Sequence, residues 1–377
     1  MTSLASIPMV DLRKQYLALA DDINTSISEV LEKTHFISGE NVQAFEREAA
    51  HYLGAKHAIS CANGTDALHL AMLAAGIGPG DEVITTPFTF IATVEAIAYV
   101  GATPVLVDVD MASYNIDPAM IEAAITKKTR AIVPVHLFGM PCDMQAIDGL
   151  AKQHKLTIIE DCAQSFGATH NGKQTGTLGS IGSFSFFPSK NLGCFGDGGM
   201  LSCNDDDLAN KLQVLKSHGS AERYIHSVIG YNSRLDEIQA AILRHKLKNI
   251  NHYNSERRRV AAHYCECLSD LPVSLPQLKF VGGGDATPVF HQFTLLTDQR
   301  AAIQKALQDN QIASAIYYPI PLHKQEAING LLTSTPHCPN AEALSEQCMS
   351  LPIYPELDDD SIERIAGVIK SVLSVAA

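Results

Sequence analysis

Residues 183–193 read SFSFFPSKNLG, and this stretch decides how the chain folds. Its first five residues are apolar or small and predict a strand that ends just before a single lysine, Lys190. Glycine-rich chain follows at residues 196–199. A charged ammonium group is costly to bury behind an apolar strand. The Lys190 amine is therefore interpreted as covalently bound, in an imine with an aldehyde, although a solvated surface lysine is the usual fate of this residue type.

Six further β-rich segments alternate with helical patterns on both sides of this strand. Several of the segments are almost wholly apolar, which is typical of strands that are covered on both faces. The alternation predicts an α/β fold with a mostly parallel seven-stranded sheet sandwiched by helices. The seven expected strands are 58–61, 82–85, 104–108, 131–135, 157–161, 183–187 and 200–203.

Helical patterns and one late strand divide the chain into two expected domains. Residues 66–75 and 234–248 carry apolar residues at helical spacing. Beyond residue 250 the chain predicts a long amphipathic helix, then a strand at 289–294 and a final helix. We expect a large α/β domain over residues 1–250, which includes an N-terminal helical segment, and a smaller α+β domain over residues 251–377.

Composition limits the possible partners of the chain. The net charge of −13 over 377 residues argues against a general nucleic-acid or membrane-surface binder. No stretch approaches the roughly 20 apolar residues that a membrane helix needs, and the N-terminus does not resemble a secretory signal. The nine cysteines are odd in number and lack zinc-site spacing, which predicts reduced thiols, no metal and a cytoplasmic location.

An acidic residue stands at the end of the strand 157–161. Ligands of open α/β sheets lie at the carboxyl ends of strands, so Asp161 is predicted to face a binding site, with Gln164 close behind it. The alternative is that Asp161 caps the helix that follows.

A candidate anion site follows the first strand. Asn63-Gly64-Thr65-Asp66 opens a helix, and the free backbone amides of such a turn bind anions; a plain strand-to-helix turn is the alternative. Ser185 could add a hydroxyl to the same anion or could be an ordinary polar strand position. Phe90 could stack on a cofactor ring or belong to the core.

The ordered set of anion turn, strand-end acid and lysine is more specific than any of its parts. Pyridoxal phosphate needs a lysine imine at its aldehyde, a carboxylate at its ring nitrogen and an anion site for its phosphate. A dinucleotide-binding dehydrogenase would instead carry G-x-G-x-x-G after the first strand, where this chain has Ala62-Asn63-Gly64-Thr65. The set therefore predicts a pyridoxal-phosphate site.

The chain resembles the DegT/DnrJ/StrS type of pyridoxal-phosphate-dependent nucleotide-sugar aminotransferases, a branch of the aspartate aminotransferase fold. The resemblance extends over roughly residues 7–373. Its most specific segments are ANGTDAL at 62–68, EDCAQSFGA at 160–168, FSFFPSKNLGCFGDGG at 184–199 and GYNSRLDEIQAAIL at 230–243.

The resemblance implies a role for each matching residue. Lys190 and Asp161 are the implied catalytic residues, the first bound to the cofactor aldehyde and the second to the pyridine nitrogen. The resemblance also implies a homodimer, in which Asn232 from the neighbouring subunit would complete the phosphate site. The other implied cofactor contacts are Gly64, Thr65 and Ser185 at the phosphate, Gln164 at the ring hydroxyl and Phe90 over the ring. Implied contacts to the sugar or its diphosphate are Arg234, Tyr318, His323 and Lys324.

The implied reaction is a two-step transamination through pyridoxal and pyridoxamine phosphate. Glutamate donates its amino group and leaves as 2-oxoglutarate, and a nucleotide-linked keto sugar then accepts the amine. Lys190 moves the proton and must be neutral, although an ordinary lysine has a pKa near ~10.4. The amino sugar produced would feed polysaccharide or glycoside biosynthesis.

Three features bear on the reaction and on the choice of substrate. A dehydrating branch of the family has histidine at the lysine position, whereas this chain has Lys190. The segment from Lys190 to Gly199 is similar to members that act on 3-keto sugars, UDP- or dTDP-linked, and a 4-keto sugar is the alternative. Members that act on a sugar acid carry histidine where this chain has Tyr317, which puts a uronic acid in doubt. A non-catalytic regulatory homologue that binds the cofactor is a second alternative.

Overall fold

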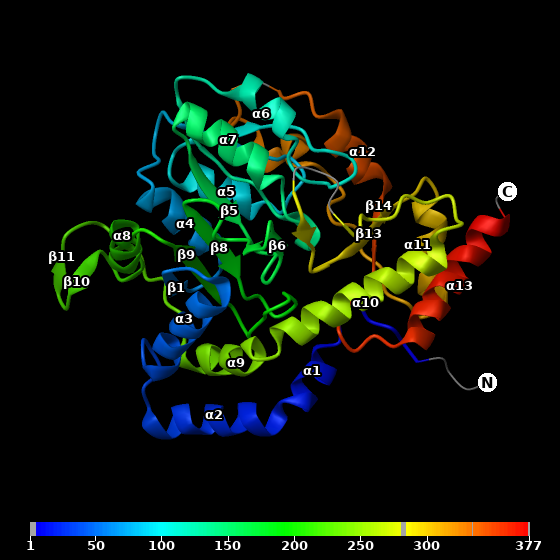
Figure 1. The fold of residues 1–377 in the computed structure, drawn as a ribbon, viewed down its shortest axis with the longest axis horizontal. Helices are drawn as coiled ribbons and strands as arrows, with labels where there is room; N and C mark the ends of the chain where they lie inside the picture. The colour runs from blue at the N-terminus through cyan, green and yellow to red at the C-terminus, as the bar shows by residue number, and fades with distance from the viewer. Residues whose placement is uncertain (1–4, 280–283, 334, 376–377) are drawn as a thin grey trace.

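The computed structural model describes residues 5–279, 284–333 and 335–375. A seven-stranded sheet forms its centre, with the strand order β1-β9-β8-β5-β4-β2-β3 (Figure 1). β9 is antiparallel to both of its neighbours, and the other pairings are parallel. The strands are β1 (His57–Cys61), β2 (Glu82–Thr85), β3 (Thr103–Leu106), β4 (Thr129–Ile132), β5 (Thr157–Asp161), β8 (Ile181–Ser185) and β9 (Gly199–Cys203). The predicted fold class is confirmed.

Helices cover both faces of this sheet because its strands are apolar on both sides. One core cluster joins the sheet to α4 (Gly64–Ala74), α5 (Ala92–Tyr99) and α8 (Asp206–Lys216). Two clusters on the opposite face join it to α3 (Glu40–Leu53), α9 (Glu237–Leu247), α6 (Pro118–Ala124) and α7 (Met144–His154). Each strand thus buries alternate side chains under different helices.

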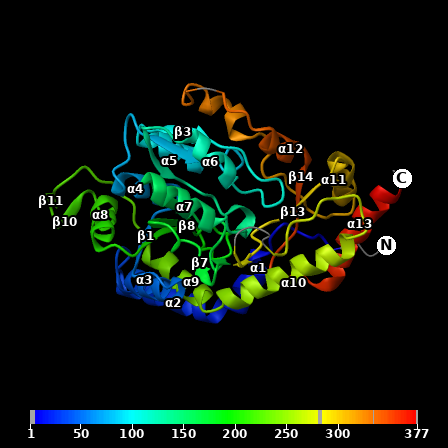
Figure 2. The same cartoon turned by 45° about the horizontal axis from the view of Figure 1, so that its top comes forward.

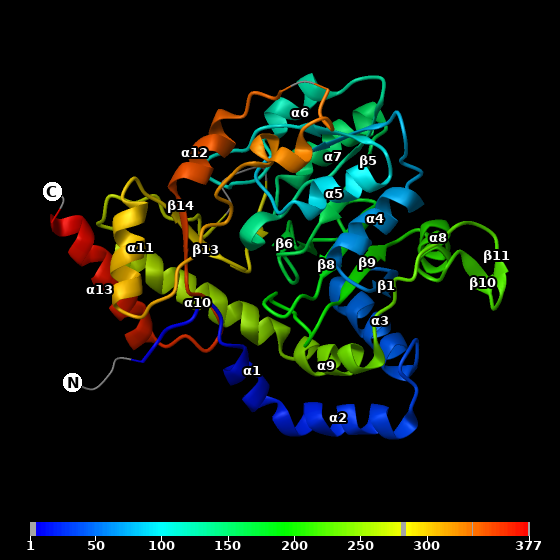
Figure 3. The same ribbon diagram turned by 180° about the vertical axis from the view of Figure 1, so that it is seen from behind.

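A second core lies beside the sheet, where Figures 1 and 3 show the long helix α10 leading away from α9. It is built from α10 (Ile250–Leu268), α11 (Arg300–Asp309), α13 (Asp359–Val375) and the antiparallel pair β13 (Phe293–Leu296) and β14 (Cys348–Leu351). Ile7 also belongs to this core, because its backbone pairs with residues 311–313. The predicted domain boundary at residue 250 stays a prediction.

The N-terminal helices and a hairpin lie at the periphery. α1 (Leu12–Ala18) and α2 (Ala20–Lys33) run below α9 and α10 in Figure 1, and Figure 2 shows α2 at the lower edge beside α9. The hairpin β10 (Ser220–Glu222) and β11 (Ile225–His226) extends away from the sheet beyond α8 (Figure 1). The remaining short elements are the strands β6 (Thr169–His170), β7 (Lys173–Gln174) and β12 (Ala286–Thr287), the helix α12 (Pro339–Gln347), and the 3-10 turns η1 (Leu137–Gly139), η2 (Leu322–Lys324) and η3 (Glu326–Ile328).

One predicted strand was wrong in its position. The segment 289–294 was expected to be extended, but only residues from Phe293 onward pair with another strand. Val289 and His291 instead donate backbone hydrogen bonds to the turn at residues 138–139, and Phe290 between them has a φ of 42°. No helix in the described part of the chain is long and apolar enough to cross a membrane.

Candidate active site

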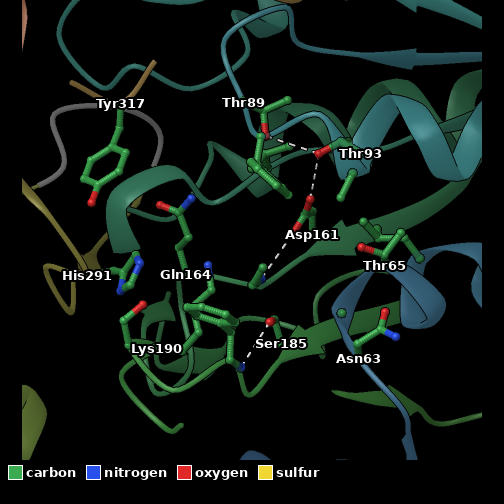
Figure 4. Close-up of a pocket in the computed structure, with 18 of the residues that line it drawn as sticks. Asn63, Thr65, Thr89, Thr93, Asp161, Gln164, Ser185, Lys190, His291 and Tyr317 are labelled. Atoms are coloured by element: carbon green, nitrogen blue, oxygen red, sulfur yellow. Dashed lines mark hydrogen bonds between the residues drawn. The ribbon is translucent and has the colours of Figure 1, made fainter. Parts of the chain in front are cut away.

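A cavity of about 510 Å³ lies at the carboxyl ends of the parallel strands. Its walls come from the start of α4, the loop after β2, and the ends of β5 and β8 (Figure 4). Four residues from the C-terminal part of the chain close the remaining side: His291, Gln292, Tyr317 and Tyr318. Among the predicted residues, the cavity brings together Gly64, Thr65, Phe90, Asp161, Gln164, Ser185, Lys190 and Tyr318.

Asp161 is the last residue of β5, and its carboxylate is buried and fixed from two sides. Oδ2 accepts a hydrogen bond of 2.9 Å from the Thr93 hydroxyl, and Oδ1 accepts one of 3.1 Å from the Ala163 amide. Burial raises the pKa of Asp161, while these two donors and the charge of Lys190 act in the opposite direction. A cationic ring nitrogen would compensate the cost of holding this carboxylate ionised.

Lys190 lies in the turn after β8, where its backbone amide donates to the carbonyl of Phe187 at 2.8 Å. Its side chain lines the same cavity as Asp161. Burial lowers the pKa of Lys190 to about 8, against the opposing pull of the Asp161 carboxylate. A substantial fraction of this amine is therefore neutral near physiological pH, as a nucleophile or proton carrier requires.

The side chain of Gln164 has a defined orientation. Its Oε1 accepts a 2.8 Å hydrogen bond from the backbone amide of Phe138, so the amide nitrogen must point the other way. That nitrogen donates to the hydroxyl of Tyr318 at 3.3 Å, inside the cavity. Gln164 thus offers a donor to a ligand oxygen.

The start of α4 forms an anion cradle opposite the end of β8. The side chain of Asn63 accepts a hydrogen bond from the amide of Asp66 and caps the helix. A Cβ on Gly64 would lie only 2.6 Å from the Cβ of Ser185, so the two segments can meet only at a glycine. The helix start and the Ser185 hydroxyl therefore converge on one point, where a phosphate fits.

Two exposed aromatic rings border the cavity. Phe90 is 55% exposed although it lies in the wall, and its ring centroid is 6.3 Å from that of Tyr318. Phe187 is 52% exposed on the same cavity. Rings exposed toward a cavity provide a stacking surface for a planar ligand.

Asn232 and Arg234 lie in a neighbouring cavity of about 530 Å³ rather than in the first one. Asp197 lines both cavities and connects them. Asn232 is exposed, whereas the Nε atom of Arg234 is buried without a hydrogen-bond partner in the described chain. The predicted roles of both residues stay predictions.

His323 and Lys324 are outside the residues that line the two cavities. Both pair with Glu342, at 3.1 Å and 2.5 Å respectively. Their predicted contact with the sugar or its diphosphate stays a prediction, and in this conformation they tie η2 to α12.

A buried network lies directly behind Asp161. The Glu160 carboxylate accepts hydrogen bonds from His136 and from the backbone amides of Gly176, Leu178 and Gly179. His136, Glu160 and Cys162 have ligand atoms within 4.8 Å of one another. Because these contacts already occupy Glu160 and the other ring nitrogen of His136 faces the Cys142 amide, we interpret the group as structural support.

Several residues of the site were not predicted from the sequence. Thr89 and Thr93 are bonded to each other and form a hydroxyl relay to Asp161, and their spacing of four residues after a strand was an available signal. His291 and Gln292 reach the cavity only through the tertiary fold, and so does Tyr317, which the sequence singled out only for its bearing on a uronic-acid substrate.

The residues of the cavity fit pyridoxal phosphate. The cradle that a Gly64 Cβ would fill matches the phosphate, the buried Asp161 carboxylate matches the ring nitrogen, and the Gln164 donor matches the ring hydroxyl. Lys190 supplies an amine of lowered pKa for the aldehyde.

Comparisons with known proteins agree with this arrangement. The profile of the DegT/DnrJ/EryC1/StrS aminotransferase family matches residues 18–370. The chain is 52% identical over 373 residues to the UDP-N-acetyl-3-dehydro-alpha-D-glucosamine 3-aminotransferase of Acidithiobacillus ferrooxidans, covering 99% of this chain and 100% of that protein.

Two solved structures share the fold. S. venezuelae DesV in complex with a ketimine intermediate has a TM-score of 0.94 and 40% identity, covering 98% of both chains. The structure of ntda from Bacillus subtilis with bound cofactor PMP has a TM-score of 0.89 and 30% identity, covering 99% of this chain and 86% of that one.

Proposed function

Because this chain belongs to the DegT/DnrJ/EryC1/StrS aminotransferase family, we propose that it aminates the 3-keto carbon of a nucleotide-linked sugar. The chain is a pyridoxal-phosphate-dependent sugar aminotransferase. The finer proposal is a UDP-linked, N-acetylated 3-keto hexose as acceptor and L-glutamate as donor. The 52% identity to an enzyme named for such a substrate supports this choice. The observation that carries the proposal is the convergence of Lys190, Asp161 and the Gly64 cradle in one cavity.

The central residues of the cavity have definable tasks. When bound, pyridoxal phosphate supplies an aldehyde that carries the amino group and a ring that withdraws electrons from the reacting carbon. Asp161, fixed by Thr93 and Ala163, keeps the ring nitrogen protonated. The amides at the start of α4 and the hydroxyl of Ser185 hold the phosphate.

Lys190 performs the proton transfer. Once its amine is released by the incoming amino donor, it takes a proton from the donor α-carbon and delivers a proton to the sugar carbon. Its pKa of about 8 leaves enough neutral amine for the first of these steps.

The decisive experiment is a panel of keto sugars assayed with glutamate. Formation of 2-oxoglutarate with a UDP-linked 3-keto sugar, and not with the matching 4-keto sugar, is expected. A preference for the 4-keto sugar would contradict the 3-keto assignment. A cofactor absorbance that does not change on addition of glutamate would point to a non-catalytic regulatory protein.

A homodimer is part of the proposal, with Asn232 of the partner subunit completing the phosphate site. The hairpin β10–β11 and the residues after it expose Tyr224 by 80%, Ile225 by 61% and Ile229 by 91%, which favours burial against another subunit. Ile229→Lys should yield monomers in sedimentation velocity, whereas Met120→Lys, at an exposed apolar position on α6, should not. A dimer that persists at micromolar concentration in Ile229→Lys would refute this interface.

A cytoplasmic location and a role in polysaccharide or glycoside biosynthesis belong to the same proposal.

A further inference from the structure

His291 is a buried histidine in the wall of the cavity that the tasks above leave unused. It is 5% exposed, and Figure 4 shows its ring beside Gln164 and Lys190. Burial lowers its pKa well below the usual range, and the nearby positive charges of Lys190 and Arg257 lower it further. His291 is therefore a neutral imidazole, with one N–H donor and one lone-pair acceptor.

The neighbouring amides decide which ring nitrogen carries the proton. Asn254 donates its Nδ2 to the carbonyl of Phe166 at 3.0 Å, so its Oδ1 faces Asn191. Asn191 then uses its Nδ2 to donate to that Oδ1 at 2.8 Å and to the carbonyl of Val289 at 3.0 Å. The Oδ1 of Asn191 is left to accept from His291, 3.2 Å away. Nδ1 of His291 is thus the protonated nitrogen, and Nε2 is the acceptor.

The backbone around His291 is held as firmly as its ring. Its amide donates to the carbonyl of Phe138 at 2.8 Å, and its carbonyl accepts from the buried Arg257 guanidinium at 3.3 Å. Gly139 permits this approach, because a Cβ there would lie 3.0 Å from the His291 amide nitrogen. Such clamping from several elements is typical of a residue whose position matters to a site.

Within the described chain, the ring of His291 bonds through Nδ1 to Asn191, which leaves Nε2 available, and both His291 and Lys190 line one cavity. Nε2 of His291 is an acceptor on a fixed ring, and Nζ of Lys190 is a donor at the end of a flexible side chain. We infer that His291 is a positioning residue whose Nε2 accepts a hydrogen bond from the Lys190 amine and holds it in the cavity between proton transfers. This inference rests on the proposed role of Lys190 in the transamination.

Two substitutions distinguish the acceptor role of the His291 Nε2 atom from the contact that Nδ1 makes with Asn191. His291→Asn places an amide where Nδ1 was, so it keeps a donor toward Asn191 and loses the acceptor in the cavity. His291→Gln places its terminal amide where Nε2 was and keeps the acceptor, while the contact to Asn191 is lost. A purely structural role predicts that the Gln variant is the more damaged of the two.

The test uses the cofactor-free protein and needs no sugar, so it is independent of the substrate assignment. Acetic anhydride labels Lys190 at a series of pH values, and peptide mass spectrometry follows the rate relative to the exposed Lys127. The groups that face Lys190 are Asp161 from β5 and His291, with Arg257 behind the latter. An acceptor stabilises the ammonium form, so the labelling midpoint in His291→Asn should fall by about one pH unit, the size of one charge-assisted hydrogen bond.

His291→Gln should keep the wild-type midpoint. In the protein loaded with pyridoxal phosphate, the glutamate half-reaction should slow about tenfold in His291→Asn alone, with KM little changed. An unchanged midpoint in His291→Asn, or an equal fall in both variants, overturns the inference. If either variant fails to fold, chemical modification of His291 in a Lys190 variant tests the same inference. Diethyl pyrocarbonate should modify His291 faster in Lys190→Met than in the wild type, and equal rates overturn the inference.

Discussion

Gly64→Ala tests the phosphate cradle at its narrowest point. The added Cβ would lie 2.6 Å from the Cβ of Ser185 and 3.2 Å from its Cα. Carbon atoms pack at about 3.5–4.0 Å, so the start of α4 and the end of β8 must separate by about 1 Å. Overpacking of this kind costs about 1–3 kcal/mol of unfolding free energy.

The same displacement should also weaken cofactor binding. Hydrogen bonds to a charged group contribute about 1.5–3 kcal/mol each, and misplacing the helix amides removes at least one of them. Loss of one such bond corresponds to roughly a tenfold to hundredfold rise in Kd for pyridoxal phosphate. Absorbance titration of the cofactor-free protein measures this Kd, and calorimetry measures the change in Tm.

Gly149→Ala is the matched control. Gly149 lies inside α7, and nothing is within 4 Å of a Cβ built there. The substitution should raise stability by about 0.5–1 kcal/mol through helix propensity and leave the cofactor Kd unchanged. If Gly64→Ala binds the cofactor as tightly as the wild type, the cradle does not hold the phosphate and the orientation of the whole site is refuted.

Three further predictions concern the catalytic pair. Lys190→Ala should abolish both transamination and the absorbance band of the lysine-bound cofactor; turnover at the wild-type rate would reject the lysine. Asp161→Ala should retain that band but lower kcat by at least about a hundredfold, since the ring nitrogen loses its partner; near-normal turnover would remove Asp161 from its role. In the cofactor-free wild type, labelling of Lys190 should rise with pH through about 8, because the amine is protonated and unreactive below its lowered pKa and neutral above it. A midpoint near the usual ~10.4 would contradict this environment.

The sheet could be predicted from the sequence because each of its strands carries its own signal. Short apolar segments between glycine, proline and helical patterns located all seven strands, and the structure changed only their ends. The segment 131–135, for example, stops pairing as a regular strand at Ile132, and Val135 forms a single bridge to Asp161. That bridge brings the loop after β4 to the cavity wall.

The error at residues 289–294 has a tertiary cause. The β-branched and aromatic residues Val289, Phe290 and Phe293 are typical of a strand. The backbone amides in the first half of the segment instead donate hydrogen bonds to the turn at residues 138–139, far earlier in the chain. The Arg257 guanidinium donates hydrogen bonds to the carbonyls of Phe290 and His291. The local sequence is the same for a strand and for a segment held by such long-range hydrogen bonds, so His291 could not have been assigned to the site.

The pKa of Lys190 depends on two opposing contributions, and binding of the cofactor changes their balance. Burial lowers the pKa of this amine, and the Asp161 carboxylate raises it. When Asp161 pairs with a cationic ring nitrogen, its charge is compensated and its pull on Lys190 weakens. Asp161 therefore keeps Lys190 partly protonated in the cofactor-free protein and loses this effect when the cofactor is bound. A lysine released next to a bound ring should therefore have a still lower pKa, as a base for the donor α-carbon requires.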